Sequence, residues 1–285
     1  PPRFMALVPR GRNATALAEA NAYDFDARIS FVEESHRYYI DGVPFSGPSV
    51  TRIKDDAFGG NDFDPDAVIA KNWAGWKEKA EQGVDAKYPN MIRSRTDEEA
   101  FEAIKRSWKL ANELGTLLHA QAELYLNDMP VVGDDRVKKE FEQFLMFMRT
   151  FAVLKPIRTE LSLYYTDADG NVVAVGQLDA LFQDPTTGEF CIVDFKRTDK
   201  KLNANIKAYR GKTGVGLLAD TPATDYYKYS LQQSLYSVMY EQRTGVAIKR
   251  MFLLALPPSA SEFKLALCAD MRGVAKQLLD GLTAP

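Results

Sequence analysis

Two carboxylates and a lysine close two short apolar segments in the second half of the chain. They belong to Gly176-Gln-Leu-Asp179 and to the tripeptide Asp194-Phe-Lys196. Alternation and an intervening turn sequence predict that Val173–Gln183 and Glu189–Lys196 are neighbouring strands of a hairpin, which would bring these side chains together. Paired carboxylates suit Mg²⁺ or Mn²⁺, and a lysine beside them could orient a water or stabilise an anion. Such a group is suited to phosphodiester hydrolysis.

The same residues also have a simpler interpretation. Acidic residues at strand ends are often only solvated, and an Asp-x-Lys tripeptide occurs by chance in many proteins. Here, however, Asp194 and Lys196 follow an apolar strand and share one of its faces, because they stand at positions i and i+2. Two charges on one face of such a strand indicate that they meet something, so we favour the chemical interpretation.

Composition is that of an ordinary globular protein. The chain has 285 residues, enough for one large domain or two small ones, with 46% hydrophobic and 26% charged residues. A net charge of −3 argues against attachment to nucleic acid by bulk charge, although a local basic channel remains compatible with it. No stretch approaches the length of a membrane span, so no membrane partner is expected.

Cysteine usage and the first residues bear on the compartment. Cys191 and Cys268 are the only cysteines, and we expect both to be buried in a reducing compartment. We therefore expect an intracellular protein of the nucleus, cytoplasm or an organelle, not a secreted one. Pro1 to Ala18 carries three arginines and no acid, as in transit peptides of organelles such as the mitochondrion. A trimmed or disordered tail is the alternative that we favour.

Periodicity and turn residues predict a mixed α/β (α+β) fold, in which a mixed sheet is flanked by helices and preceded by a mostly helical N-terminal half. The predicted elements are, in order, a hairpin turning at Asp41-Gly42, helices over 65–126 interrupted near 83–89, a helix over 137–151, a meander of strands over 158–166, 172–183 and 189–196, a long basic loop over 197–223, a helix over 224–243, strands over 247–256 and 262–268, and a helix over 271–282.

Two helices add candidate polar residues. Gly115, His119 and Glu123 recur every four residues and so share one helix face, where the glycine would let a backbone or a phosphate approach the histidine. A lone helix histidine is more often structural, but this arrangement sets His119 apart. In the helix over 224–243, Gln232 and Tyr236 also share a face, and a buried glutamine there would need partners for its amide.

These motifs together resemble a known family. Gly115-x-x-x-His119, Gly176-x-x-Asp179, Asp194-x-Lys196 and Gln232-x-x-x-Tyr236, in that order, resemble the PD-(D/E)xK nucleases, in the RecB-like exonuclease branch. The resemblance covers the chain from about Gly115 to its C-terminus. More loosely, the chain is similar to the standalone members found in large DNA viruses, phages and protists. From the residue patterns we expect a flexible arm over 1–25 and a hairpin and helical region over 26–110, and the resemblance implies a PD-(D/E)xK nuclease core over 111–285.

The resemblance also implies roles for individual residues. The ligands of a Mg²⁺ or Mn²⁺ ion would be His119, Asp179, Asp194 and the backbone carbonyl of Phe195. The other catalytic positions would be Lys196, which orients the attacking water, the additional acid Glu160, and Gln232 and Tyr236 in the wall of the site. Some relatives hold an iron–sulfur cluster on four cysteines, which this chain lacks, so it resembles the cluster-free members.

The expected partner is DNA, single-stranded or at strand ends. The residues expected to contact it are Arg197, Lys200, Lys201, Arg210, Lys212, Tyr236 and Tyr240. Gly211-Lys-Thr213 lacks the earlier glycine of a phosphate-binding loop, so no ATP is expected, and unwinding would need a helicase or other repair and replication proteins in trans.

Three functions remain open at this point. The first is a metal-dependent DNA exonuclease of repair, recombination or replication, with a preference for single strands. The second is a structure-specific endonuclease of the same fold, and the third is a catalytically silent nucleic-acid-binding module. The third is disfavoured because every position of the chemical set is filled.

Overall fold

The computed structural model describes residues 16–60, 63–83, 88–93 and 95–285. The chain divides into two compact units, the larger formed by Pro1–Gly60 with Leu117–Pro285 and the smaller by Asn61–Thr116. Each unit has its own hydrophobic core. The region predicted as separate over 26–110 is therefore divided, because the residues before Gly60 pack with the sheet of the larger unit.

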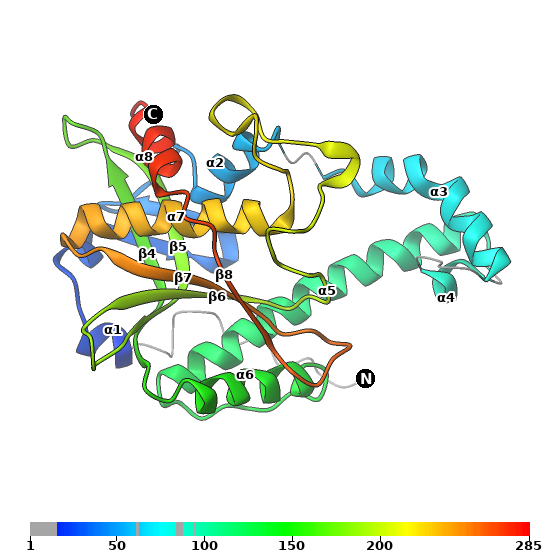
Figure 1. Cartoon of the computed structure of the whole chain (residues 1–285), viewed down its shortest axis with the longest axis horizontal. Coiled ribbons are helices and arrows are strands. Elements are labelled where there is room, and N and C mark those ends of the chain that lie inside the picture. The colour runs from blue at the N-terminus through cyan, green and yellow to red at the C-terminus, as the bar shows by residue number, and fades with distance from the viewer. Residues whose placement is uncertain (1–15, 61–62, 84–87, 94) are drawn as a thin grey trace. The chain divides into compact units, whose positions relative to one another are not determined.

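A five-stranded mixed sheet forms the centre of the larger unit (Figure 1). Its strands, in both chain and spatial order, are β4 (Lys155–Thr166), β5 (Val172–Gln183), β6 (Phe190–Lys196), β7 (Ile248–Ala255) and β8 (Lys264–Leu267). All neighbours are antiparallel except β6 and β7, which are parallel. The predicted meander and both later strands are thus confirmed, and so is the mixed α/β class.

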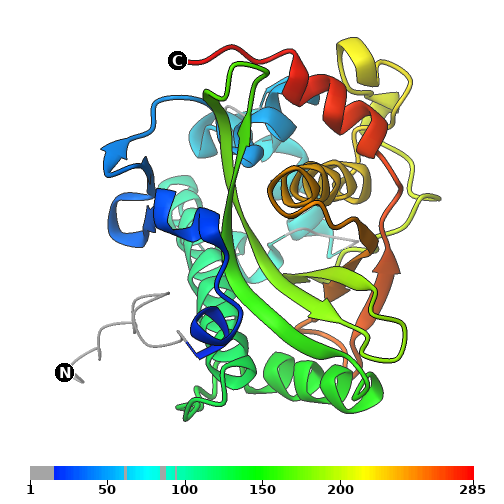
Figure 2. The same cartoon turned by 90° about the vertical axis from the view of Figure 1, so that its left-hand side faces the viewer.

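Helices cover both faces of this sheet (Figure 2). The parallel pair β6–β7 requires a crossover, and α7 (Asp225–Thr244) supplies it. Together with α8 (Arg272–Asp280), α7 packs on one face through Leu231, Leu235 and Met239. The other face is covered by α6 and the last turns of α5. Both faces are apolar, so the sheet is buried on both sides.

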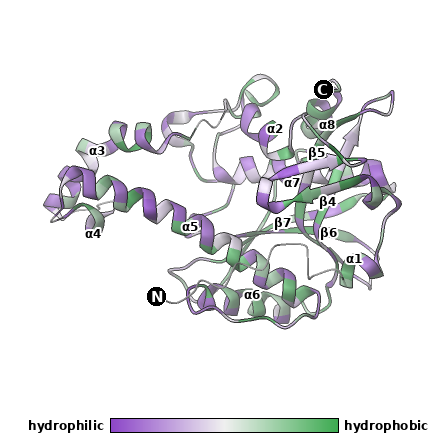
Figure 3. Cartoon of the chain, turned by 180° about the vertical axis from the view of Figure 1, so that it is seen from behind, coloured by the Kyte–Doolittle hydropathy of each residue, from purple (hydrophilic) through white to green (hydrophobic). Residues whose placement is uncertain are grey.

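The helices of the second face have an amphipathic sequence. In α6 (Lys138–Thr150) green and purple residues alternate in Figure 3. Phe144 and Phe147 turn inward and are buried against the sheet. The 30-residue helix α5 (Asp97–Leu126) begins in the smaller unit, and its residues from Leu117 onward belong to the larger one. Its Leu118 and Ala122 contribute to the same core.

The N-terminal elements of the larger unit belong to its core. A small sheet contains β1 (Ile29–Val32), β2 (Arg37–Ile40) and β3 (Val43–Pro44), and the turn between β2 and β3 is at Asp41-Gly42 as predicted. The stretch predicted to alternate up to Arg52 instead becomes helical at α2 (Val50–Ala57), where the Ser49 hydroxyl accepts from the Arg52 amide as an N-cap. Val50 and Ile53 of α2 are buried in the core.

The predicted flexible arm over 1–25 lies only in part within the described residues. Its first 15 residues lie outside the described part of the chain. From Ala16 the chain forms α1 (Ala16–Ala20) and the short 3₁₀ helix η1 (Asp24–Arg28). Phe25 is buried, and Tyr23 packs against the same core, so this segment is held by apolar burial that charge patterning alone did not reveal.

The smaller unit is helical, with α3 (Pro65–Gln82) and α4 (Pro89–Ile92) packed with the start of α5. Its three tryptophans, Trp73, Trp76 and Trp108, pack around the apolar cluster of this unit, as expected for core residues. Asp64 caps α3 by accepting from two backbone amides, and Pro65 occupies the first helical position, as its sequence predicts.

Two further expectations concern the whole chain. Within the described ranges, none of the helices has both the length and the apolar character needed to cross a bilayer. Cys191 and Cys268 are both buried and unbonded, and burial raises the pKa of each thiol. They pack as small apolar side chains in the cores of the larger unit.

Candidate metal centre

The candidate site lies where strands β5 and β6 separate. Their backbone ladder ends at the pair Ala180–Val193, while β6 continues its pairing with β7 as far as Lys196. Beyond that point the backbone amide of Phe195 donates to Asp179 Oδ2 at 2.8 Å. The separation therefore opens room for the side chain of Asp179 between the two strands, at the position that the hairpin interpretation indicated.

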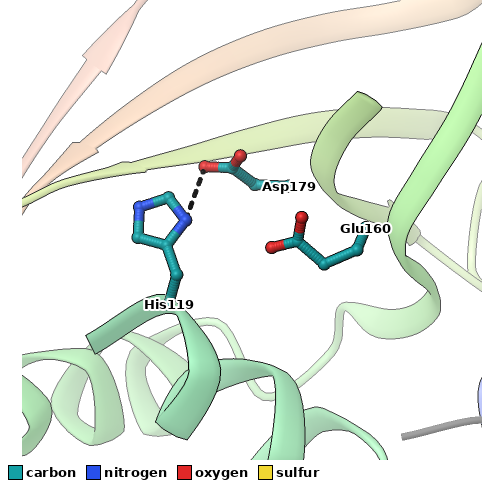
Figure 4. A group of neighbouring side chains, drawn as sticks. All are labelled: His119, Glu160 and Asp179. Carbon is teal, nitrogen blue, oxygen red and sulfur yellow. Dashed lines mark ion pairs between the residues drawn. The ribbon is translucent and has the colours of Figure 1, made fainter. Parts of the chain in front are cut away.

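Three potential ligands gather at this opening. One side-chain donor atom each from His119, Glu160 and Asp179 lies within 4.8 Å of the other two (Figure 4). They come from α5, β4 and β5, and all three side chains are half-buried. One imidazole and two carboxylates form a donor set that Mn²⁺ and Mg²⁺ accept. The acid predicted with least support, Glu160, is thus a member of the closest group.

The ring of His119 is oriented for ligation. Its Nε2 lies 2.8 Å from the carbonyl oxygen of Phe195, and its Nδ1 faces Asp179 Oδ2 at 3.5 Å. If Nε2 carries the proton and donates to the carbonyl, the lone pair of Nδ1 is directed toward the carboxylates. A hydrogen bond from the second ring nitrogen to a carbonyl is the usual support of a metal-binding histidine. In this arrangement the Phe195 carbonyl, which the family resemblance implies as a metal ligand, accepts a hydrogen bond from the ring of His119.

Glu160 has an unusual backbone for a residue inside a strand. Its φ is 46°, in the left-handed region, between residues Thr159 and Leu161 that pair regularly with β5. The Glu160 carbonyl accepts from the Gln177 amide group at 3.0 Å, which helps to hold this conformation. A non-glycine residue in this region carries a cost of roughly 1 kcal/mol or more, and such residues concentrate at functional sites. The side chain of Glu160 points toward those of His119 and Asp179 (Figure 4).

Asp194 lies outside this closest group. Its carboxylate is bound by the ammonium of Lys196, at 2.8 Å and 2.7 Å from its two oxygens. Gln233 Nε2 donates to the same carboxylate at 2.9 Å. Asp194 is 2% exposed, and the ammonium of Lys196 lies 4.9 Å from the ring centre of Tyr229. The structure thus places Asp194 as the partner of the lysine, beside the three ligands.

Burial and charge act on this ion pair in a predictable way. Burial raises the pKa of the Asp194 carboxyl above its ordinary value, with Lys196 opposing the shift. Burial acts to lower the pKa of Lys196, but the negative charges of Asp194 and Asp179 outweigh it and raise that pKa. Lys196 therefore stays a cation at neutral pH.

The predicted glutamine–tyrosine pair occupies the wall beside this group. Gln232 Nε2 donates to the Tyr236 hydroxyl at 3.3 Å. Tyr236 is buried, and its ring leaves no room for a side chain at Gly176 on β5. A β-carbon at Gly176 would lie 2.7 Å from Tyr236 Cε1 and 2.7 Å from Val50 Cγ2. The glycine of the Gly-x-x-Asp motif thus permits α7 and α2 to approach the strand.

Three residues near the site were missed from the sequence. Gln233 is the glutamine that binds Asp194, although its neighbour Gln232 fits the family spacing. The positive charge of Lys54 on α2 acts on the Asp194 carboxyl and lowers its pKa. The pKa of Tyr38 on β2 is raised mainly by burial and secondly by the negative charge of Glu160. Gln233 directly follows Gln232 in the sequence, and nothing in the sequence indicated that Gln233 would be the glutamine buried against Asp194. The other two come from elements assigned to a separate region.

The basic residues expected to contact DNA divide into two groups. Arg197 is largely buried and forms a 2.7 Å ion pair with Glu140 on α6, so it fastens the loop to that helix. Lys200 pairs with Asp225 at 2.6 Å on the surface. The remaining three are exposed and form no ion pair in the part of the chain that the structure describes; they are Lys201, Arg210 and Lys212.

Tyr240 has a different role from the one expected. It is 1% exposed, and its hydroxyl lies 3.0 Å from that of Tyr23 in the core. Its ring is therefore not available to a nucleic acid. Gln232, Tyr236 and Tyr240 share one face of α7, and at Tyr240 that face is buried in the core. Tyr236, also expected at the DNA, is 5% exposed and closes the wall of the site.

Comparisons with known proteins give little further information. No protein-family model matches the chain. No curated protein matches it either. Among solved structures, one described as "Crystal structure of SSO0001" is similar over 81% of this chain and 71% of that chain, with 12% identity and a TM-score of 0.32. A TM-score this low does not establish a shared fold.

Proposed function

We propose that this chain is a divalent-metal-dependent deoxyribonuclease with a PD-(D/E)xK core of the RecB-like branch, acting as an exonuclease on DNA strand ends. One observation carries the proposal. His119, Glu160 and Asp179 gather within 4.8 Å beside the ion pair of Asp194 and Lys196. Three ligands next to a fixed cation are what hydrolysis of a phosphodiester requires.

The residues fit a Mg²⁺ or Mn²⁺ ion on chemical grounds. The group offers two carboxylates and an imidazole whose far nitrogen is engaged by a carbonyl. When bound, such a cation would polarise the scissile phosphate and lower the pKa of a water. Two buried thiols in separate cores cannot hold an iron–sulfur cluster, which is in keeping with a cluster-free member.

The protein residues supply orientation and charge. Lys196, held by both oxygens of Asp194, presents a positive charge at a fixed position beside the ligands. A cation there can orient the attacking water and offset the charge that develops on the phosphate. Gln233 in turn fixes Asp194, and the wall formed by Gln232 and Tyr236 limits the direction from which a strand enters.

Cleavage of defined substrates tests the proposal. Labelled linear single strands, linear duplexes and circular single strands are incubated with protein and Mg²⁺, Mn²⁺ or EDTA. We expect metal-dependent release of nucleotides from linear DNA and intact circles. Asp179→Asn and Lys196→Ala should each lower the rate at least a hundredfold, whereas Lys276→Ala, an exposed lysine on α8, should leave it unchanged.

Each alternative has its own result in this assay. Cleavage of circles would favour the structure-specific endonuclease. Binding of DNA with no cleavage under any metal would favour the silent module. Full activity in Asp179→Asn, with circular dichroism showing a native fold, would rule out the proposed site itself.

A further inference from the structure

The loop between β6 and α7 has a well-defined end that the site does not use. Within it, Thr213 pairs with Pro222, and the Gly214 amide donates to the Thr221 carbonyl at 2.9 Å. The Val215 amide donates to the carbonyl of Ala57 at the end of α2, also at 2.9 Å. These bonds give residues 213–222 of the loop a fixed conformation, in contrast to an open linker of the same length.

Close packing holds the same segment. Leu218 is 2% exposed and belongs to the core of the larger unit. A β-carbon at Gly214 would lie 2.5 Å from Leu218 Cβ and 2.9 Å from the carbonyl oxygen of Ala57, so the chain passes α2 too closely for any side chain. The loop is therefore anchored at its base by backbone and by a buried leucine.

Apolar side chains nevertheless point outward from this anchored loop. Tyr209 is 65% exposed, Val215 51% and Leu217 54%. We call these three residues the apolar tip. Exposed apolar residues on a loop that could have buried them, as it buries Leu218, indicate a contact surface. Val215 and Leu217 lie in the anchored segment, and Tyr209 lies six positions before Val215 in the same loop, with the Arg210 guanidinium 5.2 Å from its ring centre.

The charges around the apolar tip indicate the kind of partner. Lys207, Arg210 and Lys212 are exposed on the same loop and form no ion pair with any described residue. The acids of the loop sequence are Asp199, eight positions before Lys207, and Asp220, eight positions after Lys212. Apolar and aromatic groups interleaved with cations suit a strand whose bases are accessible and whose backbone is anionic. A duplex would present the phosphates but keep its bases stacked inside.

The position of the loop connects it with the candidate site. It leaves β6 directly after Lys196, the lysine of the site, and it returns to α7, which carries Gln233 (yellow in Figure 1). Its contact with α2 brings it beside the helix that carries Lys54. A strand held at this loop would thus be held next to elements that form the site.

We propose that the apolar tip binds single-stranded nucleic acid, with Tyr209 stacking on a base and Val215 and Leu217 contacting its neighbours, while Arg210 and Lys212 hold the phosphates. The inference rests on the proposed function and deepens it, since it assigns the preference for single strands to one loop. Base stacking on an aromatic side chain does not depend on sequence, so the binding should be similar for different bases.

Binding without catalysis tests this inference. Fluorescence anisotropy of labelled oligothymidine, oligouridine and a blunt duplex is measured with the full chain in EDTA, at one fixed salt concentration. We expect Tyr209→Ser to raise the Kd for the single strands about tenfold, and Val215→Ser with Leu217→Ser to raise it further. Tyr209→Phe should retain the wild-type Kd, because the ring is kept. The Kd for the duplex should change less than twofold in all of them.

The matched control is Val153→Ser, an equally exposed valine before β4 that lies outside this loop. It should bind like the wild type. Equal single-strand binding by wild type and Tyr209→Ser, or equal losses for single strands and duplex, would overturn the inference. So would binding to anionic lipid vesicles in place of oligonucleotides. The binding assay contains no metal, so its outcome is independent of the cleavage assay. If the protein cleaves DNA in the cleavage assay but its binding does not depend on the apolar tip, only this inference is contradicted. A chain that binds through the tip but never cleaves contradicts only the proposed nuclease.

Discussion

Gln233 Nε2 donates a 2.9 Å hydrogen bond to Asp194 Oδ1, joining the middle of α7 to the end of β6 inside the core. Gln233 is fully buried, and Asp194 has lost nearly all contact with water. The bond therefore helps to stabilise the buried negative charge of Asp194, which would otherwise be stabilised by Lys196 alone. It also fixes the position of Lys196, because both groups bind the same carboxylate.

This relationship predicts unequal roles for two adjacent glutamines. Gln233→Leu removes a donor from a buried carboxylate, so we expect a loss of about 1–3 kcal/mol in the free energy of unfolding and a fall in the cleavage rate. Gln232→Leu removes a longer bond from a half-exposed residue and should cost less than about 1 kcal/mol. Urea denaturation and initial cleavage rates compare the two. Equal losses, or a larger loss for Gln232→Leu, would contradict this assignment.

Glu160 should show opposite effects on stability and on metal binding. Asparagine tolerates the left-handed conformation better than glutamate, so Glu160→Asn is expected to raise the free energy of unfolding by up to about 1 kcal/mol. It also removes a charged ligand, and the increase in thermal stability that Mn²⁺ gives the wild type should shrink.

Glu160→Gln is the control for this pair of effects. It keeps the length of the side chain and the strain, so it should lose metal-induced stabilisation without gaining stability. Thermal denaturation with and without Mn²⁺ measures both quantities. Undiminished stabilisation of both variants by Mn²⁺ would place the ion elsewhere.

Gly176 should not accept even a methyl group. Gly176→Ala forces the new β-carbon against the ring of Tyr236 and the branched side chain of Val50, which are both buried. We expect a loss of about 1–3 kcal/mol in the free energy of unfolding. The control is Gly115→Ala on α5, where a β-carbon meets nothing within 4 Å and a helical alanine should add up to about 1 kcal/mol. If both substitutions shift the urea midpoint in the same direction, the packing explanation fails.

Arg197 and Lys201 separate stability from DNA binding within the same basic loop. Arg197→Ala leaves the carboxylate of Glu140 buried without its partner, so the free energy of unfolding should fall by about 3–5 kcal/mol. Lys201→Ala removes an exposed charge, so stability should stay within about 0.5 kcal/mol while the salt dependence of DNA binding becomes weaker. Thermal denaturation and anisotropy at several salt concentrations measure the two effects. A stable Arg197→Ala variant with weakened DNA binding would return Arg197 to the contact surface.

The local signals in the sequence were sufficient for most of the elements. Apolar runs separated by turn sequences predicted the meander, and the observed bounds of β5 match those predicted. The capping residue Asp64, with Pro65 after it, predicted where helix α3 begins. These features depend on hydrogen bonds and turns between residues close in the chain, so a single sequence contains them.

Distant packing was not accessible in the same way. α2 was missed because its eight residues follow an alternating stretch, and its helix is stabilised by burying Val50 and Ile53 against α7 and β5. The same burial joins the N-terminal elements to the sheet. The periodicity of an amphipathic segment shows which of its faces is apolar, but it does not show which other helix or strand that face will pack against.

By itself, the sequence determined the elements and the residue types that could perform the chemistry, namely His119, Asp179, Asp194 and Lys196, since each lies in a locally recognisable pattern. Only the tertiary structure decided how they are grouped. The separation of β5 from β6 and the strained backbone of Glu160 place that residue with His119 and Asp179, while Asp194 pairs with Lys196 and Gln233. The reason is physical. Distances between side chains on five different elements depend on how strands diverge and helices pack, and these follow from the whole core rather than from any one segment.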